Sequence, residues 1–581
     1  MTAAAPLRTS TASAAEYLAR ALHARGVRRV FGLEGGHVQP LWDHVARLGI
    51  AIVDVRDERA AVHMAHAHAE LTGTVGIAMV TAGPGVTNTV TAVANATTAG
   101  VPVVVIGGAP PMPQDYRGPL QGIPQVDILA PIARYARTVR NADLVVGELD
   151  RAISAAEGEY GDRGASYIEF PTDVLRTEVP RQVVLDEFVA PRAPRRIAPD
   201  PSAVAAAVER LWSVRRPVVI TGRGARGAAS ELLALLDALG AVYLDTQESR
   251  GLVPESHPSV VGAMRGAVMG QADVVITVGR KLDYQLGYGS PAVFPHATFV
   301  RIGDGVGEIG DNRRGAPEIF ATPALALAAI VEAARGRAPA ADRDWAGDLR
   351  RSHVERAQAY GAKLAQAPSG ADGRMHPNRI FAAIRACVPD DAIAIADGGD
   401  ILSFARLGLT QATYLDSGTF GCLGVGVPFA VAAALAHPER TVISVNGDGA
   451  FGFNAMEIDT AVRHGARAVF TVANNAAWNI ERYDQMVNYE GRIAGTELRD
   501  SDYAGLAKAL GAYAERVDDP SDLEGALRRA MSHAPALLDV KITRDAVSSD
   551  AGRGLGYVRL YQPLTAWDDA ERKRRDDGGL R

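Results

Sequence analysis

Short apolar runs rich in β-branched residues recur along the chain, and alanine- and leucine-rich stretches separate them. Continuous runs of this length are typical of strands buried on both faces, and the intervening stretches are long enough for helices. This alternation predicts an α/β fold of parallel sheets flanked by helices. The six clearest predicted strands lie at 76–82, 102–108, 217–223, 272–280, 441–447 and 466–474.

Two stretches without this pattern divide the chain. Residues 189–203 are rich in proline and arginine, and residues around 365–377 are rich in alanine, glycine and proline, so both are interpreted as linkers. At 581 residues the chain is too long for a single core, and the linkers give it three blocks of similar size and a charged tail. The first and third blocks could share one architecture. The blocks run over 1–188, 200–345 and 372–548, and the tail over 549–581.

The composition excludes several classes of protein. With 47% hydrophobic and 22% charged residues, the chain has the balance of a folded globular protein rather than a disordered one. The net charge of −6 gives no reason to expect a nucleic-acid partner, and no run approaches the ~20 apolar residues of a membrane span. Cys387 and Cys422 are too few for a disulfide framework or a cysteine metal site. No signal peptide is expected at the start, so we expect a cytoplasmic protein.

Two polar motifs follow neighbouring predicted strands in the third block. The run TVISVNGDG places Asp448 just after one strand, and ARAVFTVANN places Asn475 just after the next, with a helix between them. A right-handed crossover makes such strands parallel and brings them close, so both side chains are expected at the edge where open α/β sheets bind ligands. A carboxylate and an amide oxygen suit Mg²⁺, which usually shares its ligands with phosphate. Taken alone, the motif also fits a tight turn that uses Asp and Asn as turn formers.

The Gly–Asp–Gly triplet, separated by 24 residues from Asn–Asn, resembles the thiamine diphosphate signature of a known enzyme group. This group contains enzymes related to acetolactate synthase, benzaldehyde lyase, oxalyl-CoA decarboxylase and 2-hydroxyacyl-CoA lyase. The resemblance implies that Asp448, Asn475 and the carbonyl of Ala477 bind Mg²⁺, which anchors the cofactor's diphosphate. The cofactor-binding positions that it implies are Gly83, Pro84, Asn88, Leu423, Gly447, Asp448, Gly449, Ala450, Asn475, Ala477, Trp478 and Ile480.

The same resemblance gives the three blocks their roles. The first is implied to be pyrimidine-binding, the second a central Rossmann-like domain and the third diphosphate-binding. Because such enzymes bind the two ends of the cofactor with different subunits, the resemblance implies a homodimer or homotetramer with active sites at the subunit interface. Leu423 stands where many relatives have the methionine that bends the cofactor, and leucine can fill that volume. The tail, including 556–567, resembles the carboxyl-terminal lid of bacterial 2-hydroxyacyl-CoA lyases, although a solvated helical terminus fits it equally well.

Thiamine diphosphate chemistry needs a carboxyl group that hydrogen-bonds to the aminopyrimidine, so that the cofactor can remove its own C2 proton. In IVDVRDERAAVHMAHAHAELTG, Glu58 stands where a predicted strand gives way to an alanine-rich helix. The residues alone favour a simpler interpretation, an acid placed at a helix N-terminus by the helix dipole. The segment is similar to the family's strand–Arg-x-Glu–helix element, however, and this match makes Glu58 the implied catalytic glutamate.

Three further resemblances bear on the substrate. The segment FGLEGGHVQPLWDHV is most similar to benzaldehyde lyase, and His37 and Gln121 match its active-site histidine and glutamine, which would polarise the donor oxygen during C–C cleavage. Glu490 is the implied acceptor of the substrate's hydroxyl proton, with Glu481 as an alternative and an exposed loop glutamate as the simpler interpretation. Residues 274–294 are similar to the CoA- or ADP-binding segment of oxalyl-CoA decarboxylase and 2-hydroxyacyl-CoA lyase. The implied nucleotide or CoA contacts are Arg223, Arg280 and Asp304, and a vestigial Rossmann domain with surface arginines is the alternative.

These features favour a thiamine diphosphate- and Mg²⁺-dependent 2-hydroxyacyl-CoA lyase that cleaves the C1–C2 bond of an acyl-CoA substrate to formyl-CoA and an aldehyde or ketone, with ADP as a further ligand that the central domain could hold. The alternative within the family is an acetolactate synthase-like or benzaldehyde lyase-like carboligase or decarboxylase acting on 2-keto acids or acyloins. Retention of Glu58, Asp448 and Asn475 together argues against a non-catalytic nucleotide-binding or regulatory protein. A Rossmann dehydrogenase is disfavoured because no strand leads into a complete G-x-G-x-x-G with a ribose-binding acid downstream.

Overall fold

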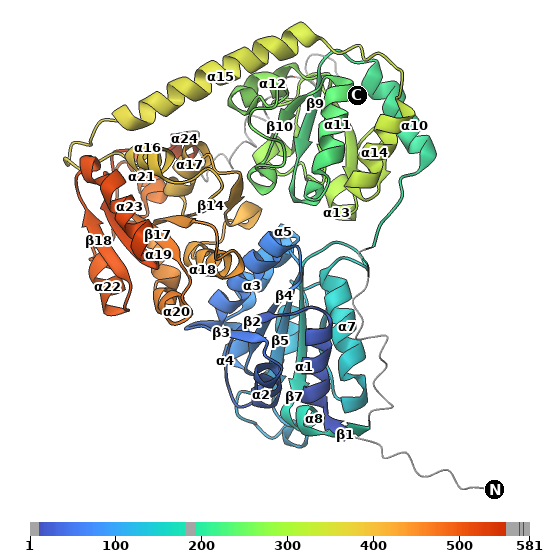
Figure 1. Ribbon diagram of the computed structural model, residues 1–581, viewed down its shortest axis with the longest axis vertical. Helices are drawn as coiled ribbons and strands as arrows, with labels where there is room; N and C mark the ends of the chain where they lie inside the picture. The colour runs from blue at the N-terminus through green and yellow to red at the C-terminus, as the bar shows by residue number, and fades with distance from the viewer. Residues whose placement is uncertain (1–10, 181–192, 194, 553–568, 570–572, 574–581) are drawn as a thin grey trace. The chain divides into compact units, whose positions relative to one another are not determined.

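Three parallel sheets carry the fold (Figure 1). The computed structural model describes residues 11–180, 193, 195–552, 569 and 573, so the predicted tail motif at 556–567 and residues 189–192 and 194 of the first predicted linker lie outside the described residues. The chain forms two compact units. One contains residues up to 195 together with 419–438 and 454–466, and the other contains 196–418, 439–453 and the residues from 467 onward.

The N-terminal sheet has six parallel strands. A separate antiparallel pair joins β1 (Thr11–Ser13), which precedes these strands in the chain, to β8 (Glu178–Pro180), which follows them. Counted in chain order within the sheet, its strands are arranged 2-1-3-4-6-5. In spatial order they are β3 (Ala51–Asp54), β2 (Arg29–Leu33), β4 (Gly76–Val80), β5 (Val103–Ala109), β7 (Ala165–Pro171) and β6 (Ala136–Thr138). The helices along this part of the chain are α1 (Ala14–Ala24), α2 (Gln39–Arg47), α3 (Glu58–Thr72), α4 (Pro84–Thr87), α5 (Val90–Ala99), α6 (Gln125–Leu129), α7 (Val145–Ala156) and α8 (Thr172–Arg176).

The C-terminal sheet also has six parallel strands in the order 2-1-3-4-6-5, so the predicted common architecture of the first and third blocks is confirmed. In spatial order they are β15 (Thr413–Leu415), β14 (Ile393–Asp397), β16 (Val442–Gly447), β17 (Ala468–Asn474), β19 (Ala536–Lys541) and β18 (Tyr513–Val517). The helices here are α16 (Asn378–Cys387), α17 (Asp400–Gly408), α18 (Gly426–Ala436), α19 (Asp448–Asn454), α20 (Glu457–Arg463), α21 (Asn479–Asn488), α22 (Tyr503–Ala509), α23 (Leu523–His533) and α24 (Ser549–Gly552). Of these, α18 and α20 lie in the first compact unit.

The central sheet has five parallel strands in the order 2-1-3-4-5. In spatial order they are β10 (Val242–Leu244), β9 (Pro217–Thr221), β11 (Val274–Val278), β12 (Thr298–Gly303) and β13 (Glu318–Phe320). Around them in the chain stand α10 (Pro201–Trp212), α11 (Ala229–Leu239), α12 (Arg265–Gln271), α13 (Val306–Ile309), α14 (Pro323–Ala333) and the long α15 (Arg343–Gln366). The second predicted linker therefore begins at the end of α15.

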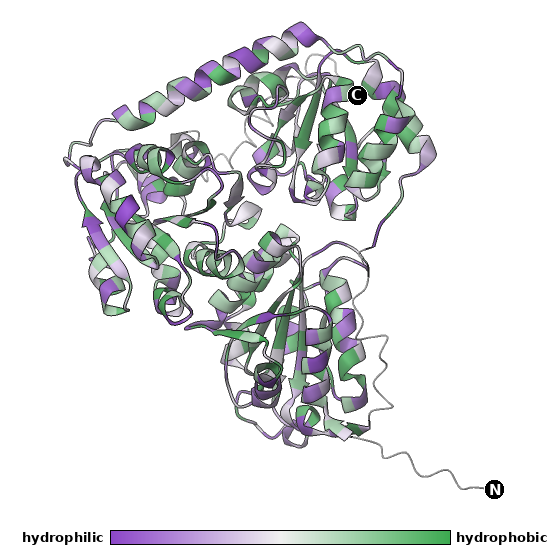
Figure 2. Cartoon of the chain, in the orientation of Figure 1, coloured by the Kyte–Doolittle hydropathy of each residue, from purple (hydrophilic) through white to green (hydrophobic). Residues whose placement is uncertain are grey.

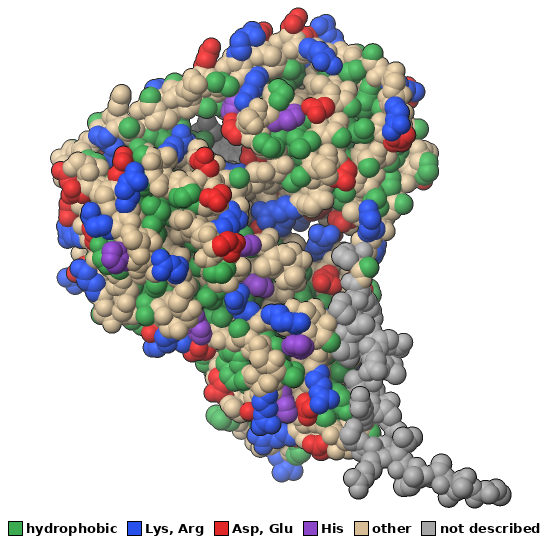
Figure 3. Space-filling model, in the orientation of Figure 1, with side chains coloured by type: hydrophobic (Ala, Val, Ile, Leu, Met, Phe, Trp, Pro, Cys, Tyr) green, Lys and Arg blue, Asp and Glu red, His purple; other side chains and the backbone are tan. Residues whose placement is uncertain are grey.

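Burial explains why the apolar runs form strands. All six predicted strands are present, and most of their residues are buried on both sides of a sheet because helices cover both faces. Figure 2 shows this as mostly green strands and mixed green and purple helices, with α15 strongly mixed along its length. On the face in Figure 3, lysine and arginine side chains lie among aspartate and glutamate, in keeping with the small net charge.

Local capping fixes the helix beginnings that matter for the site. The Asp57 side chain accepts a hydrogen bond from the Arg59 N–H at 2.8 Å and so starts α3 at Glu58. Gly73, with a φ of 70°, ends the same helix in the left-handed conformation that glycine adopts most readily. Among the described residues, no helix is long and apolar enough to cross a membrane.

Candidate active site

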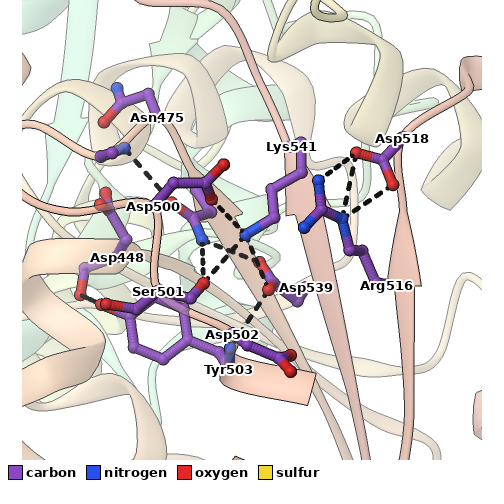
Figure 4. Close-up of polar contacts among 12 residues, drawn as sticks. Asp448, Asn475, Asp500, Ser501, Asp502, Tyr503, Arg516, Asp518, Asp539 and Lys541 are labelled. Atoms are coloured by element: carbon purple, nitrogen blue, oxygen red, sulfur yellow. Dashed lines mark hydrogen bonds and ion pairs between the residues drawn. The ribbon is translucent and has the colours of Figure 1, made fainter. Parts of the chain in front are cut away.

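Asp448 and Asn475 meet at the carboxyl edge of the C-terminal sheet. β16 and β17 are adjacent and parallel, with Gly447 opposite Ala473, so both strands end at the same edge. Asp448 is the first residue of α19 rather than part of a free turn, and Asn475 follows β17 directly. Backbone N–H groups of Asn475 and of the residue after it donate to the Asp448 carboxylate. The predicted convergence of these two motifs on one point is confirmed (Figure 4).

The Asp448 carboxylate is buried. Asp448 is only 2% exposed, and among the described residues its Oδ2 atom has no hydrogen-bond partner. Burial raises the pKa of Asp448 to about 7, although backbone N–H groups that bind the carboxylate oppose the shift. A bound divalent cation would compensate this desolvated oxygen, so the site fits Mg²⁺.

The turn after β17 leaves a carbonyl oxygen for the same cation. Arg544 donates from Nε to the Asn475 carbonyl and from Nη2 to the Ala476 carbonyl, both at 2.8 Å. Between described residues, no hydrogen bond uses the next carbonyl, that of Ala477. No cluster of three or more His, Cys, Asp and Glu able to hold a metal occurs in the described part of the chain. A metal here would therefore combine one carboxylate, one amide and one carbonyl oxygen, as the sequence motif predicts.

Glycines along this edge of the sheet lie close to neighbouring side chains. A Cβ atom on Gly449 would lie 2.5 Å from the Trp478 ring, so glycine is required there by the packing of the ring. A Cβ on Gly399 would lie 3.1 Å from the Ile480 side chain, and one on Gly447 would lie 3.3 Å from Ile401. Ala450 and Ile480 are themselves buried. Side chains therefore pack directly on the main chain at these glycines.

Glu58 lies at a corresponding edge of the N-terminal sheet. It is the first residue of α3, and its side chain is 7% exposed. Asn88, which ends α4, donates from Nδ2 to Glu58 Oε2 at 2.9 Å. A Cβ on Gly85 would lie 3.4 Å from Oε1 of the same glutamate. The glycine-rich loop at 83–88 therefore surrounds the predicted catalytic carboxyl group.

His37 and Gln121 are in contact, although 83 positions separate them in the chain. They follow β2 and β5, two strands of the same sheet, and their side chains share a hydrogen bond. Partial burial lowers the pKa of His37, while the bond to Gln121 raises it. Gln121 has a φ of 61°, an uncommon conformation for a residue with a side chain. Gly83 contacts the backbone of Gln121 so closely that a Cβ there would lie 2.8 Å from Cβ of Gln121, which joins this pair to the loop around Glu58.

Gln125 is a site residue that sequence reasoning missed. It is 2% exposed, accepts a hydrogen bond from the Gly83 N–H at 2.5 Å and donates to the Gly108 carbonyl at 3.1 Å. Glu169, on β7, accepts a second bond from the same amide at 2.5 Å. Gly108 in turn packs on His37, because a Cβ at 108 would lie 2.6 Å from its Cβ. The only sequence signal was a polar residue four positions after Gln121, which is too weak to assign a role.

The predicted nucleotide contacts lie at the carboxyl ends of neighbouring strands in the central sheet. Arg223 follows β9, Arg280 follows β11 and Asp304 follows β12. The strands β9 and β11 flank the point where the strand order reverses, the usual ligand position in such a sheet. Arg280 is 3% exposed and binds both oxygens of Asp283, at 2.7 and 2.9 Å. Arg223 lies 3.8 Å from Glu248, so carboxylates partner both arginines.

Three other predicted positions differ in their surroundings. The Glu490 side chain is 81% exposed and pairs with Arg492, on a backbone with a φ of 57°. Desolvation raises the pKa of Glu481, at the start of α21, and the nearby Asp400 adds to this shift. Leu423 lies in the first compact unit just before α18, partly exposed. The roles of these residues stay predictions.

The comparisons with known proteins agree with this geometry. Residues 12–129 match the N-terminal TPP binding domain of thiamine pyrophosphate enzymes, residues 204–330 match their central domain, and residues 401–540 match their C-terminal TPP binding domain. The chain belongs to the thiamine pyrophosphate enzymes. Thiamine pyrophosphate is another name for thiamine diphosphate, so the predicted family, the three-domain α/β fold and the cofactor-binding domains are confirmed.

Relatives with two different names are similar to nearly the whole chain. The acetolactate synthase large subunit IlvG of Mycobacterium tuberculosis is 33% identical over 542 residues, which cover 91% of this chain and 96% of the relative. The 2-hydroxyacyl-CoA lyase 2 of Mus musculus is 34% identical over 551 residues, covering 87% of this chain and 85% of the relative. The mouse 2-hydroxyacyl-CoA lyase 1 is 28% identical over 560 residues. The chain is thus an enzyme of the acetolactate synthase and 2-hydroxyacyl-CoA lyase group.

Proposed function

We propose that the protein is a thiamine diphosphate- and Mg²⁺-dependent 2-hydroxyacyl-CoA lyase. In this reaction the C1–C2 bond of a 2-hydroxyacyl-CoA breaks, and its electron pair stays with C1. The 2-hydroxyl group loses a proton to become an aldehyde or ketone, and C1 gains a proton to leave as formyl-CoA. The bound cofactor supplies the electron sink that makes this cleavage feasible. Asp448, Asn475 and the Ala477 carbonyl hold the metal, and Glu58 binds the aminopyrimidine.

The contact between His37 and Gln121 carries the proposal. Cleavage of a 2-hydroxyacyl group requires hydrogen-bonding side chains that can follow an oxygen from hydroxyl to carbonyl. A neutral histidine and a glutamine amide each offer a donor and an acceptor. Burial lowers the pKa of His37, which keeps the imidazole neutral near pH 7 and able to accept a proton. The pair lies beside the Glu58 loop in one compact unit.

The central domain supports a nucleotide-bearing substrate. Arg223 and Arg280 stand on either side of the reversal point of its sheet, and guanidinium groups are suited to bind the phosphates of CoA or ADP. Both have carboxylate neighbours, including Glu248, which lies 3.8 Å from Arg223 and 3.7 Å from Arg280. We infer that a bound phosphate competes with these carboxylates for the arginines. Asp304 remains the proposed contact to the ribose.

The second candidate is an acetolactate synthase-like carboligase, favoured by the 33% identity to IlvG over 91% of the chain. The two proposals differ in substrate, so one experiment separates them. Purified full-length enzyme with thiamine diphosphate and Mg²⁺ is offered a 2-hydroxyacyl-CoA in one tube and pyruvate in another, and the products are identified by mass spectrometry. We expect formyl-CoA and a carbonyl product from the first tube only. Acetolactate from pyruvate, with the CoA ester unchanged, would establish the second candidate instead.

A further inference from the structure

A lysine and an aspartate are buried together behind the proposed metal site. Lys541, the last residue of β19, is 1% exposed and Asp539 on the same strand is fully buried. The Lys541 Nζ lies 2.9 Å from Asp539 Oδ2, and it also donates to Asp500 at 2.7 Å and to the Ser501 carbonyl at 3.0 Å (Figure 4). Removing two charges from water is unfavourable unless other contacts compensate, so the pair calls for a reason beyond stability.

The aspartate of this pair holds the metal-binding turn. Asn474, the first of the two adjacent asparagines, donates from Nδ2 to Asp539 Oδ1 at 3.0 Å. Its own Oδ1 accepts from the Ala476 N–H at 3.2 Å, and its Nδ2 also reaches the Ser501 carbonyl at 3.1 Å. The two asparagines therefore have different tasks. Asn474 fastens the turn to β19, whereas Asn475 Oδ1 accepts a hydrogen bond from the Ala477 N–H at 3.1 Å and has a second lone pair to offer the metal.

The Asp539 carboxylate also binds Tyr503, which contacts the backbone of the other proposed metal ligand, Asp448. Asp539 Oδ2 accepts a hydrogen bond from the Tyr503 N–H at 3.2 Å. The Tyr503 hydroxyl donates to the Asp448 carbonyl at 3.4 Å, and its ring lies edge-on to Phe451, with 5.1 Å between ring centroids. One buried carboxylate thus connects the backbone of Asp448 with the turn that carries Asn475.

We propose that Asp539, held by Lys541, is a positioning residue that orients Asn475 and Asp448 for Mg²⁺. This inference rests on the proposed Mg²⁺ site. Lys541 binds Oδ2 of Asp539, and the carboxylate then serves Asn474 with Oδ1 and Tyr503 with Oδ2. Residues behind metal ligands typically change metal affinity about 10- to 100-fold when they are replaced, because they orient the ligands.

The test measures Mg²⁺ binding directly. The full-length enzyme, freed of metal and supplied with thiamine diphosphate, is titrated with Mg²⁺ by isothermal titration calorimetry. We expect Lys541→Met to raise the Mg²⁺ dissociation constant at least about tenfold. Asn474→Ala, which keeps the ion pair but removes its contact with the turn, should raise it similarly and serves as the deciding variant if Lys541→Met does not fold.

Two controls separate positioning from general stability. Leu538→Ala removes a fully buried side chain from the same strand, but side chains alternate along a strand, so it faces away from Asp539. Arg529→Met removes the partly exposed ion pair with Glu515 of the neighbouring strand β18, and Glu515 lies opposite Leu538 rather than Asp539. Both controls should bind Mg²⁺ within about twofold of the wild type, even where Leu538→Ala lowers the melting temperature.

The possible results separate the positioning role of Asp539 from the proposed Mg²⁺ site on which it rests. Weakened Mg²⁺ binding in Lys541→Met and Asn474→Ala, with both controls unchanged, supports the positioning role. Wild-type affinity in folded Lys541→Met, or an equal loss in Leu538→Ala, would overturn it while leaving the metal site standing. Absence of saturable Mg²⁺ binding in the wild type would overturn the proposed metal site itself.

Discussion

At the scale of single residues, Asp448 is the position where function and stability conflict most clearly. Among the described residues its Oδ2 atom has no hydrogen-bond partner, and burial of such a carboxylate is unfavourable in the protein without metal, so burial raises its pKa to about 7. The same oxygen becomes favourable once a cation binds. Because of this residue, the stability of the metal-free protein should fall as the pH rises, and binding of Mg²⁺ should raise it.

The sign of this dependence follows from the raised pKa. Between about pH 4 and pH 7 the folded protein holds a proton on Asp448 that the unfolded chain has released. The contribution of Asp448 to stability is therefore greatest at the acidic end, decreases by about 1.4 kcal/mol per pH unit across this window and levels off above it. In metal-free protein, Asp448→Asn should lack this decrease, so it should gain thermal stability relative to the wild type as pH rises from 5 to 8.

The measurement is a series of melting curves from pH 5 to pH 8, with and without Mg²⁺ and thiamine diphosphate. Adding both ligands at pH 8 should restore the wild type and leave Asp448→Asn unaffected. An equal pH dependence in the two metal-free proteins would contradict the assignment of the raised pKa to Asp448.

The sequence singled out Asp448 and Asn475 through short motifs at predicted strand ends and Glu58 through the family resemblance, and their roles stay predictions. It also paired His37 with Gln121 through resemblance, and their hydrogen bond supports this pairing. The partners behind them, Gln125 and Asp539, could not be found in this way. Their roles depend on contacts between strands and loops far apart in the chain, which no local pattern records.

At the scale of elements, strand ends organise the candidate residues of each six-stranded sheet. His37, Glu58, Gly83 and Gln121 follow four different strands of the N-terminal sheet, and all of these strands are parallel, so their carboxyl ends share one edge. The sequence predicted the strands well because buried parallel strands are continuous apolar runs. It predicted α19 less well, since Asp448 starts that helix and was expected in a turn.

Strand β5 contacts His37 through Gly108, so a substitution of this glycine tests whether the position of the histidine matters. A methyl group at Gly108 would lie 2.6 Å from the His37 Cβ, so Gly108→Ala must displace the histidine or the strand. We expect Gly108→Ala to lower kcat/KM about 100-fold, because a displacement of about 1 Å in a reacting group has that effect. Mg²⁺ and thiamine diphosphate should still bind.

Gly147→Ala in α7 is the matched control, because a Cβ there meets nothing within 4 Å and the change lies in the same domain. It should leave kcat/KM unchanged. Steady-state kinetics of the two variants, with cofactor binding by calorimetry, provide the comparison. Wild-type activity in Gly108→Ala would show that His37 has no part in the reaction or that its position is not critical.

At the scale of the whole molecule, the two six-stranded sheets repeat one strand order, and the five-stranded sheet that lies between them in the sequence has a different order. The sequence predicted three α/β blocks from the strand runs and the linkers. It did not predict that α18 and α20, which belong to the third block in sequence, lie in the first compact unit. The α18 segment GVPFAVAAALA is apolar all round, and Phe429 within it packs against His63 and His66 of α3, a non-local contact that composition cannot show.

The most direct test of the proposed reaction follows one carbon atom. A 2-hydroxyacyl-CoA labelled with ¹³C at C1 is incubated with full-length enzyme, thiamine diphosphate and Mg²⁺, and with Glu58→Gln as the control. The proposed cleavage places the label in formyl-CoA and leaves the aldehyde or ketone unlabelled, and Glu58→Gln should form neither product at a measurable rate. Label that remains in intact substrate, or equal turnover by Glu58→Gln, would contradict the assignment of this protein as a thiamine diphosphate-dependent 2-hydroxyacyl-CoA lyase.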